Sequence, residues 1–321
     1  MNRTFFTSIV IAVIVLVFSG CTTFKAISVM NGGRPTSDIP LSEISFKTKG
    51  EHIIIVPVKI NNSAKQYNFM LDTGALTLVS KKTAEELNLP SGVEIVAKDS
   101  VGATKPMQLT NLDLLRLGKM TVAECPTGIL DFTEFGGNLK DPEGMDIDGV
   151  IGSNFLRYFK VTIDYKNQKM YLSNDTRKIP AKDGTYRIEF TTDMKNGYAP
   201  RIQCTIDNNI KVKAIIDTGA PYIATLPFSL VEKTDAYKKG QVVHSKGNIW
   251  GAAFKASENN QLLRLKYFQI GTLKLNYIPV ISLPSNDILV GKKFLSKFMV
   301  TLNYPAKEMI LVPHDTLNFP T

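Results

Sequence analysis

The tripeptide Asp-Thr-Gly occurs twice in this chain, each time directly after an apolar run that is typical of a buried strand. The first copy, Asp72-Thr73-Gly74, follows Phe69-Met70-Leu71, and the second, Asp217-Thr218-Gly219, follows Ala214-Ile215-Ile216. Two carboxylates that leave two buried strands in the same sequence context predict one site built from two copies of a fold. Such a pair can share a proton and activate a water molecule.

The duplication extends well beyond the two triplets. The aligned aspartates are 145 residues apart, and the offset becomes 153 between Leu117-Gly118 and Ile270-Gly271. It becomes 139 between Val150-Ile151-Gly152 and Leu289-Val290-Gly291. Offsets that change between elements, while each element keeps its own register, place the length differences in loops. This pattern is typical of a true internal repeat.

Equivalent elements surround the two triplets. Upstream of them, Ile53 to Ile60 and Arg201 to Ile206 are predicted strands. Downstream, Ser80 can cap a helix that begins at Lys81, and Thr225 before Leu226-Pro227 predicts the start of the matching helix. Each half therefore consists mostly of strands with short helices.

This pattern predicts an all-β fold of two lobes, the first covering residues 41–180 and the second residues 183–314. We expect the lobes to be β-barrel-like and to be related by a pseudo-twofold axis. Residues 21–40 lack a periodic apolar pattern and are expected to form a tether to the first lobe.

Each lobe resembles the aspartic peptidase fold shared by pepsin and the retroviral proteases. The resemblance lies in the apolar-apolar-Asp-Thr-Gly-Ala turn and in the later apolar-apolar-Gly motif before a short helix, and it covers both lobes. Ala75 and Ala220 after the triplets, together with the run from Asp148 to Tyr165, are the pattern of the bacterial retropepsin-like peptidases. The alternative is that the triplets are only turns, in which Asp and Gly serve backbone geometry.

The resemblance implies a catalytic role for Asp72 and Asp217. The two side chains would face each other across the lobe interface and hold a water molecule between them. One carboxyl group would stay protonated, because two charges so close repel each other in a poorly solvated site. The ionised aspartate would take a proton from the water while the protonated one donates to a peptide carbonyl. No cofactor and no metal are implied.

The rest of each triplet would form the active-site loops. The resemblance implies that Thr73 and Thr218 hydrogen-bond across the interface and hold the two loops together. Gly74 and Gly219 would let the loops turn and would present backbone N–H groups to the carboxylates.

Pepsin-like enzymes carry a flap tyrosine, yet this chain has no Tyr or Trp between Tyr67 and Tyr158. The expected flap is Val101-Gly102-Ala103-Thr104, which bears Gly102 as retropepsin flaps bear glycine. Its counterpart in the second half carries Trp250, the only Trp of the chain. Trp250 either covers substrate or belongs to the core or rim of its lobe.

The N-terminus is typical of an export signal. Arg3 precedes the apolar segment from Phe5 to Phe18, and small residues lead to Cys21, so residues 1–20 are predicted to be a signal peptide. The placement of Cys21 resembles a bacterial lipoprotein signal, in which that cysteine is acylated. An uncleaved anchor and plain secretion remain alternatives. No later stretch is long and apolar enough to predict a membrane span.

Other features give weaker indications. Cys125 and Cys204 fall in different halves, and both a bridge and two unpaired buried thiols are compatible with the sequence. The histidines show no metal-ligand spacing. The net charge of +9, from 38 basic and 29 acidic residues, comes from scattered lysine pairs without a nucleic-acid motif, so no nucleic-acid partner is expected.

The sequence as a whole predicts an exported, lipid-anchored aspartic endopeptidase that faces the periplasm or the exterior. Its partners would be a peptide or protein substrate and, through the lipid anchor, a membrane. It would act as a monomer, because both half-sites lie on one chain. The alternative is a catalytically inactive peptide-binding or scaffolding module of the cell envelope that keeps the same fold.

Overall fold

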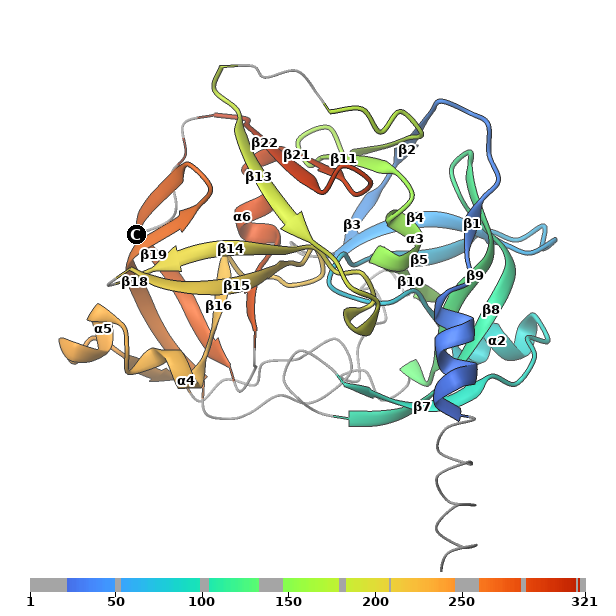
Figure 1. Ribbon diagram of the computed structural model, residues 1–321, viewed down its shortest axis with the longest axis horizontal. Helices are drawn as coiled ribbons and strands as arrows, with labels where there is room; N and C mark the ends of the chain where they lie inside the picture. Colours follow the sequence, from blue (N-terminus) through green and yellow to red (C-terminus); the bar gives the residue numbers. More distant parts are fainter. Residues whose placement is uncertain are drawn as a thin grey trace, which may run out of the picture.

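The structure is a computed structural model, and it describes residues 22–49, 53–98, 104–132, 147–178, 183–207, 209–245, 260–283, 287–315 and 317. The expected signal peptide, Cys21, Gly102 and Trp250 lie outside the described residues. The chain forms two lobes side by side beneath a shared sheet (Figure 1). Both lobes are built almost entirely of strands, so the expected all-β, two-lobe fold is confirmed.

The first half of the chain begins with a helix at residues 22–30, called here the N-terminal helix. Its remaining elements are β1 (Arg34–Pro35), β2 (Leu41–Ser45), β3 (Lys47–Lys49), β4 (Ile53–Ile60), β5 (Tyr67–Leu71), β6 (Leu78–Ser80), α2 (Lys81–Glu86), β7 (Val93–Lys98), β8 (Thr104–Leu117), β9 (Met120–Leu130), β10 (Gly149–Ile151), α3 (Ser153–Leu156), β11 (Lys160–Asp164) and β12 (Lys169–Ser173).

The second half repeats this order. Its elements are β13 (Tyr186–Thr191), the 3-10 turn η2 (Met194–Asn196), β14 (Arg201–Ile206), β15 (Ile210–Ile216), β16 (Ala224–Pro227), α4 (Phe228–Val231), α5 (Asp235–Lys238), β17 (Val243–Ser245), β18 (Asn260–Ile270), β19 (Leu273–Leu283), β20 (Ile288–Val290), α6 (Lys292–Leu295), β21 (Phe298–Asn303) and β22 (Glu308–Pro313).

The strand pairings show the internal repeat directly. In the first lobe β5 lies parallel to β10, and β6 lies parallel to β9. In the second lobe β15 lies parallel to β20, and β16 lies parallel to β19. The long hairpins β8–β9 and β18–β19 turn at Gly118 and Gly271, which both have positive φ angles of 60° and 55°. Glycine adopts such angles without strain, which explains its presence at both turns.

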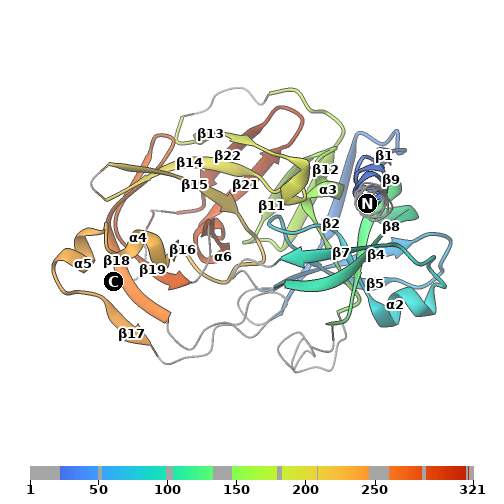
Figure 2. The same ribbon diagram turned by 60° about the horizontal axis from the view of Figure 1, so that its bottom comes forward.

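A sheet shared by both halves joins the lobes. Its strands run in the order β13, β22, β21, β11, β12, β2, so that three strands come from each half. The central pair is β11 with β21, matched antiparallel from Lys160 opposite Asn303 to Asp164 opposite Met299. This sheet lies over both lobes in Figure 1 and behind them in Figure 2.

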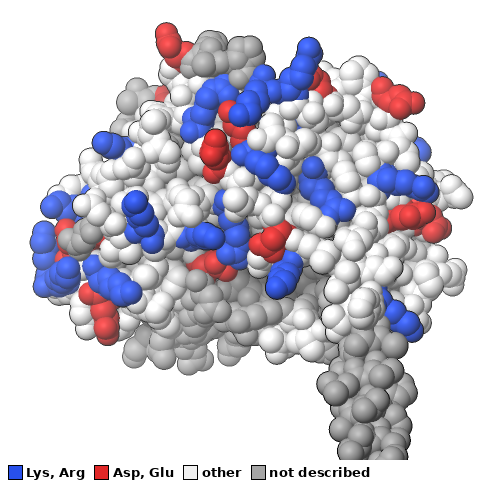
Figure 3. Space-filling view, in the orientation of Figure 1, with Lys and Arg blue, Asp and Glu red and all other residues white. Residues whose placement is uncertain are grey.

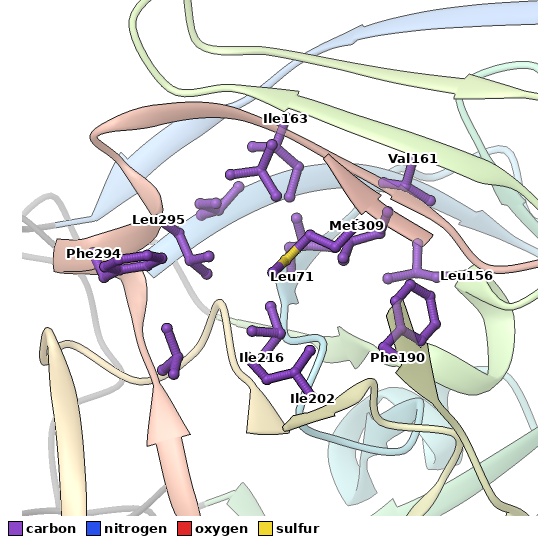
Figure 4. Packing of buried hydrophobic residues seen from close by; sticks show 14 of the residues in the cluster. Leu71, Leu156, Val161, Ile163, Phe190, Ile202, Ile216, Phe294, Leu295 and Met309 are labelled. Atoms are coloured by element: carbon purple, nitrogen blue, oxygen red, sulfur yellow. The ribbon is translucent and has the colours of Figure 1, made fainter. Parts of the chain in front are cut away.

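One large apolar core extends across the interface between the lobes. Leu71 and Ile216, the residues just before the two aspartates, point into it, and Met309 of β22 lies nearby (Figure 4). The side chains of Leu71 and Ile216 are fully buried. The apolar residue before each Asp-Thr-Gly therefore anchors its loop in a core common to both halves.

The helix starts predicted from the local sequence can be compared with the structure. Ser80 caps α2 as expected, its hydroxyl accepting a hydrogen bond from the Thr83 N–H at 3.1 Å. The matching helix α4 is present and Pro227 lies at its start, but it begins at Phe228, two residues later than predicted, and Thr225 lies in strand β16. The hydroxyl of Thr225 instead accepts a hydrogen bond from the N–H of Leu289, 64 residues away.

The segment expected as a tether is structured over part of its length. Residues 22–30 are helical, and Arg34–Pro35 forms strand β1 beside β9. That these residues also link the fold to an anchor stays a prediction. Among the described residues, no helix is both long and apolar enough to cross a membrane. Basic side chains are spread over the face shown in Figure 3, with acidic ones among them.

Candidate active site

The two aspartates occupy equivalent positions at the ends of two buried strands. Asp72 follows β5, and its N–H donates to the Ile151 carbonyl at 3.0 Å. Asp217 follows β15, and its N–H donates to the Val290 carbonyl at the same distance. Each aspartate is thus held by the parallel strand beside it, and both side chains are buried. The repeat brings together at the lobe interface two residues that are 145 positions apart.

The threonines of the two triplets bind each other across the interface. The hydroxyl of Thr218 accepts a hydrogen bond from the Thr73 N–H at 3.0 Å, and the hydroxyl of Thr73 accepts one from the Thr218 N–H at 3.1 Å. Each hydroxyl also donates to the opposite strand, Thr73 to the Ile216 carbonyl and Thr218 to the Leu71 carbonyl. These four bonds use every hydrogen-bonding group of two fully buried side chains. The two active-site loops are therefore fixed relative to each other.

The glycines of the triplets allow the two carboxyl groups to approach. A Cβ atom on Gly74 would lie 2.8 Å from Cγ of Asp217, and one on Gly219 would lie 2.5 Å from Oδ2 of Asp72. Each glycine thus packs against the aspartate of the other lobe, where no side chain fits. The carboxyl groups of Asp72 and Asp217 therefore lie close enough for each to shift the pKa of the other. Two carboxyl groups so placed share one proton at moderate pH.

The two aspartates have different electrostatic surroundings. Burial, followed by the charge of Asp217, raises the pKa of Asp72 well above its ordinary value. Burial also raises the pKa of Asp217, but its hydrogen bond with Asp72 opposes that shift. Oδ1 of Asp217 accepts N–H groups from Gly219 at 2.9 Å and Ala220 at 3.0 Å, which stabilise its charge. Asp72 also accepts an N–H, from Gly74 to its Oδ1 at 2.8 Å, so the shared proton belongs to the pair and not to either residue.

A second layer supports the loops from behind. A Cβ on Gly152 would lie 2.3 Å from the backbone of Leu76, and one on Gly291 would lie 2.4 Å from the Tyr222 carbonyl oxygen. Both glycines therefore pack directly beneath the loops that follow the triplets. Ser153, next to Gly152, donates its hydroxyl to the Thr73 carbonyl at 2.7 Å and also contacts the hydroxyl of the fully buried Tyr304.

The aspartates lie at the floor of a cleft. The cavity has a volume of about 890 Å³, and its lining includes Asp72, Asp217 and parts of both lobes. Strands β7 and β8 are paired up to Lys98 opposite Thr104, and residues of both strands line the cavity. Figure 2 shows where β7 and β8 lie in the fold. The expected flap residue Gly102 lies between these strands, outside the described residues. Trp250 lies between β17 and β18, also outside them.

The two halves of the cleft differ in charge. In the second lobe Arg201 pairs in register with Ile215, two residues before Asp217, and its guanidinium binds the Asp287 carboxylate at 3.0 and 3.3 Å. Both members of this ion pair line the cavity. In the first lobe the position equivalent to Arg201 is Ile55, which pairs with Met70, two residues before Asp72. The second half of the cleft therefore carries an ion pair that has no counterpart at the equivalent strand position of the first half.

Sequence reasoning missed the contribution of the N-terminal helix. Thr22, Thr23, Ala26, Ile27 and Met30 line the same cavity as the two aspartates. Their spacing of three to four residues is a weak helical signal that the surrounding segment hides. Arg201 and Asp287 were also missed, because their proximity depends on strand pairing across 86 residues.

The remaining sequence candidates do not form a further site in the described structure. Cys125 and Cys204 are buried and free, so of the two possibilities left open by the sequence the structure has the unpaired thiols. Burial raises the pKa of both thiols to about 12, which keeps them protonated and unreactive. No group of three or more potential metal ligands occurs among the described residues.

Comparison with known proteins bears on the identity of this arrangement. No curated protein matches the chain. Residues 56–155 match a family model described as aspartyl protease. This segment includes the first triplet, strands β7 and β8 and Gly152, and the match supports a protease-type function. The resemblance to the aspartic peptidases, drawn from the two triplets, is therefore confirmed over residues 56–155.

Proposed function

We propose that the protein is an aspartic endopeptidase that hydrolyses peptide bonds with a water molecule activated by Asp72 and Asp217. One observation carries this proposal. Two buried carboxyl groups, one from each half of the chain, lie close together and line the same cavity. A fold that needed only turns at these positions would have no reason to bury two carboxyl groups against each other.

The two aspartates divide the work between a charged and a protonated carboxyl group. The charged one takes a proton from the water as the water oxygen attacks the peptide carbonyl. The protonated one donates its proton to the carbonyl oxygen, so that a neutral tetrahedral intermediate forms. When the C–N bond breaks, the proton taken from the water passes to the leaving amine, and a hydroxyl of the intermediate returns a proton to the other carboxylate. The threonine hydrogen bonds keep the carboxyl groups in place during these steps.

The alternative is an inactive module that binds peptides without cleaving them. The close approach of the carboxyl groups favours catalysis, because a binding module does not need a shared proton at its floor. A cavity of about 890 Å³ lined by both aspartates is also of the size that ligands occupy.

Export and membrane attachment are proposed on the sequence alone. Residues 1–20 would direct export, and Cys21 would carry the lipid that anchors the enzyme in the cell envelope, facing the periplasm or the exterior. Because both half-sites lie on one chain, the enzyme would act as a monomer on a peptide or protein substrate.

The proposal is tested by incubating a diverse peptide library with the wild type and with the Asp72→Asn and Asp217→Asn variants at several pH values. We expect each variant to lose at least about 1,000-fold in kcat/KM, because the pair acts as a unit. Cleavage by the wild type should be fastest in acid and should fall as the pair loses its shared proton. Product formation is read by mass spectrometry.

The matched control is Asp113→Asn, which alters an exposed aspartate of β8. It should cleave at the wild-type rate. Thermal unfolding should show that all variants are folded. Full activity of a folded Asp72→Asn or Asp217→Asn protein would rule out the shared site.

A further inference from the structure

We propose that one face of the N-terminal helix is a wall of the substrate cleft that binds an apolar side chain of the substrate. The inference rests on the proposed function and adds a specificity-determining element to it. Five helix residues line the cavity that contains Asp72 and Asp217, and they recur on one face of the helix at spacings of three to four residues: Thr22, Thr23, Ala26, Ile27 and Met30.

The helix is attached to the first lobe at its C-terminal end. The carbonyl oxygens of Gly32 and Gly33 accept hydrogen bonds from the Arg157 guanidinium at 3.0 Å and from the Tyr158 hydroxyl at 2.6 Å. Gly33 has a φ angle of 92°, and a Cβ there would lie 2.6 Å from the Tyr158 hydroxyl oxygen. Strand β1 then pairs with β9. The helix is therefore built onto the lobe through a junction that only glycine fits.

The same contacts place the helix at one end of the cleft. The Arg157 guanidinium lies 3.9 Å from the ring centre of Tyr198, which belongs to the second lobe. Tyr198 follows the turn η2, whose residues line the cavity. A Cβ added to Gly197 would lie 3.3 Å from the N atom of Leu76, four residues after Asp72. A substrate strand that leaves the aspartates toward Leu76 therefore runs toward the helix.

The chemistry of this wall selects the type of side chain it binds. Ile27 and Met30 present apolar groups to the cavity, and Leu76 and Met107 line it as well. An apolar substrate side chain placed there removes apolar surface from water on both partners, which is favourable. A charged side chain would lose hydration without gaining a partner on the helix.

The helix itself supplies a matched control. Ile27 and Phe24 are both exposed apolar residues, with exposed fractions of 40% and 76%. They lie three positions apart on one helix, but only Ile27 lines the cavity. A glutamate at either position changes the charge and hydrophobicity of the helix in the same way. Only Ile27→Glu also changes the cleft.

The experiment compares the cleavage profiles of the wild type, Ile27→Glu and Phe24→Glu on the same peptide library. We expect Ile27→Glu to lower kcat/KM about tenfold for peptides with an apolar residue at one position on one side of the cleaved bond. For Ile27→Glu, the kcat/KM of peptides with lysine or arginine at that position should rise relative to the kcat/KM of the apolar peptides. Phe24→Glu should keep the wild-type profile to within about twofold. A profile change of equal size in both variants would overturn the inference. A uniform loss of activity on all peptides would also overturn it, because it would indicate that the glutamate simply blocks the cleft.

A binding measurement separates this inference from the proposed function. Fluorescently labelled library peptides are titrated into Asp217→Asn protein with and without Ile27→Glu. If the wild type cleaves nothing, the proposed function fails, but weaker binding of apolar peptides after Ile27→Glu would still support the wall. If the wild type cleaves and neither binding nor profile responds to Ile27→Glu, the wall is wrong and the peptidase stands.

Discussion

The shared proton of Asp72 and Asp217 has a consequence for folding as well as for catalysis. Burial and the Asp217 charge raise the pKa of Asp72 well above the unfolded value of 3.8. The folded protein then binds this proton more tightly than the unfolded chain does. The resulting stabilisation is fully present below the unfolded pKa and is lost as pH rises through the raised, folded pKa.

Asp72→Asn has no proton to lose at this position, so its stability should not fall in that pH range. We expect the free energy of unfolding of the variant, relative to the wild type, to rise by up to about 1.4 kcal/mol per pH unit between about pH 4 and the raised pKa. Above that pKa the variant should be the more stable protein. Urea denaturation at a series of pH values measures the difference. A difference that does not vary with pH would contradict the raised pKa of Asp72.

At the scale of elements, the support behind the two active-site loops is unequal. Tyr304, which follows β21, is fully buried, and its hydroxyl lies 2.7 Å from the Ser153 hydroxyl of α3. Ser153 donates its single proton to the Thr73 carbonyl, so Tyr304 must be the donor to Ser153. Tyr165 occupies the equivalent position in the first half, 139 residues earlier. Within the described part of the chain its buried hydroxyl has no hydrogen-bond partner.

This inequality predicts opposite responses to the same substitution. Tyr304→Phe should destabilise the fold by about 1–2 kcal/mol, because it removes a donor from a buried network. Tyr165→Phe should be neutral or stabilising, because it removes a buried polar group that lacks a partner. Chemical denaturation of both variants provides the comparison. Equal destabilisation by the two substitutions would mean that the Tyr165 hydroxyl has an unrecognised partner.

Elements with a local signal were predictable from the sequence. Ile53–Ile60 and Arg201–Ile206 are strands with the predicted bounds, and Ser80 caps its helix. Thr225 gave an inaccurate helix start, because its hydroxyl accepts a hydrogen bond from the Leu289 N–H and does not cap a helix. The strand pairing that brings these two residues together leaves no signal in the local sequence. The N-terminal helix was missed for the same reason, since its attachment depends on Arg157, 125 residues beyond Gly32.

Some residues of the candidate site were also predictable from the sequence, and others were not. The repeat identified Asp72 and Asp217, and the duplicated fold places them together. The ion pair of Arg201 and Asp287 was not predictable, because its two residues meet only through the pairing of β14, β15 and β20.

At the scale of the whole molecule, the shared sheet makes the two halves depend on each other. Strand β11 of the first half has β21 of the second as its neighbour over five paired residues. A first half produced alone would expose the edge of β11 and part of the common apolar core. The lobes are therefore parts of a single cooperative unit.

We expect the chain to unfold in one transition and a fragment of residues 22–180 to aggregate or remain unfolded. Amide hydrogen exchange should give the same opening free energy, within about 1 kcal/mol, for β11 and β21. Circular dichroism and gel filtration assess the fragment. Two separate transitions, or a folded soluble fragment, would show that the lobes are independent.

The ion pair between Arg201 and Asp287 gives the cleft a polarity. In a cleft with perfect two-fold symmetry, a bound strand turned end for end would meet identical surroundings, and cleavage would not depend on its direction. Here the reversed strand would meet no guanidinium at the equivalent place, because the counterpart of Arg201 is Ile55. The two directions of a bound peptide are therefore energetically distinct, so a peptidase with this cleft would cleave a sequence and its reverse at different rates.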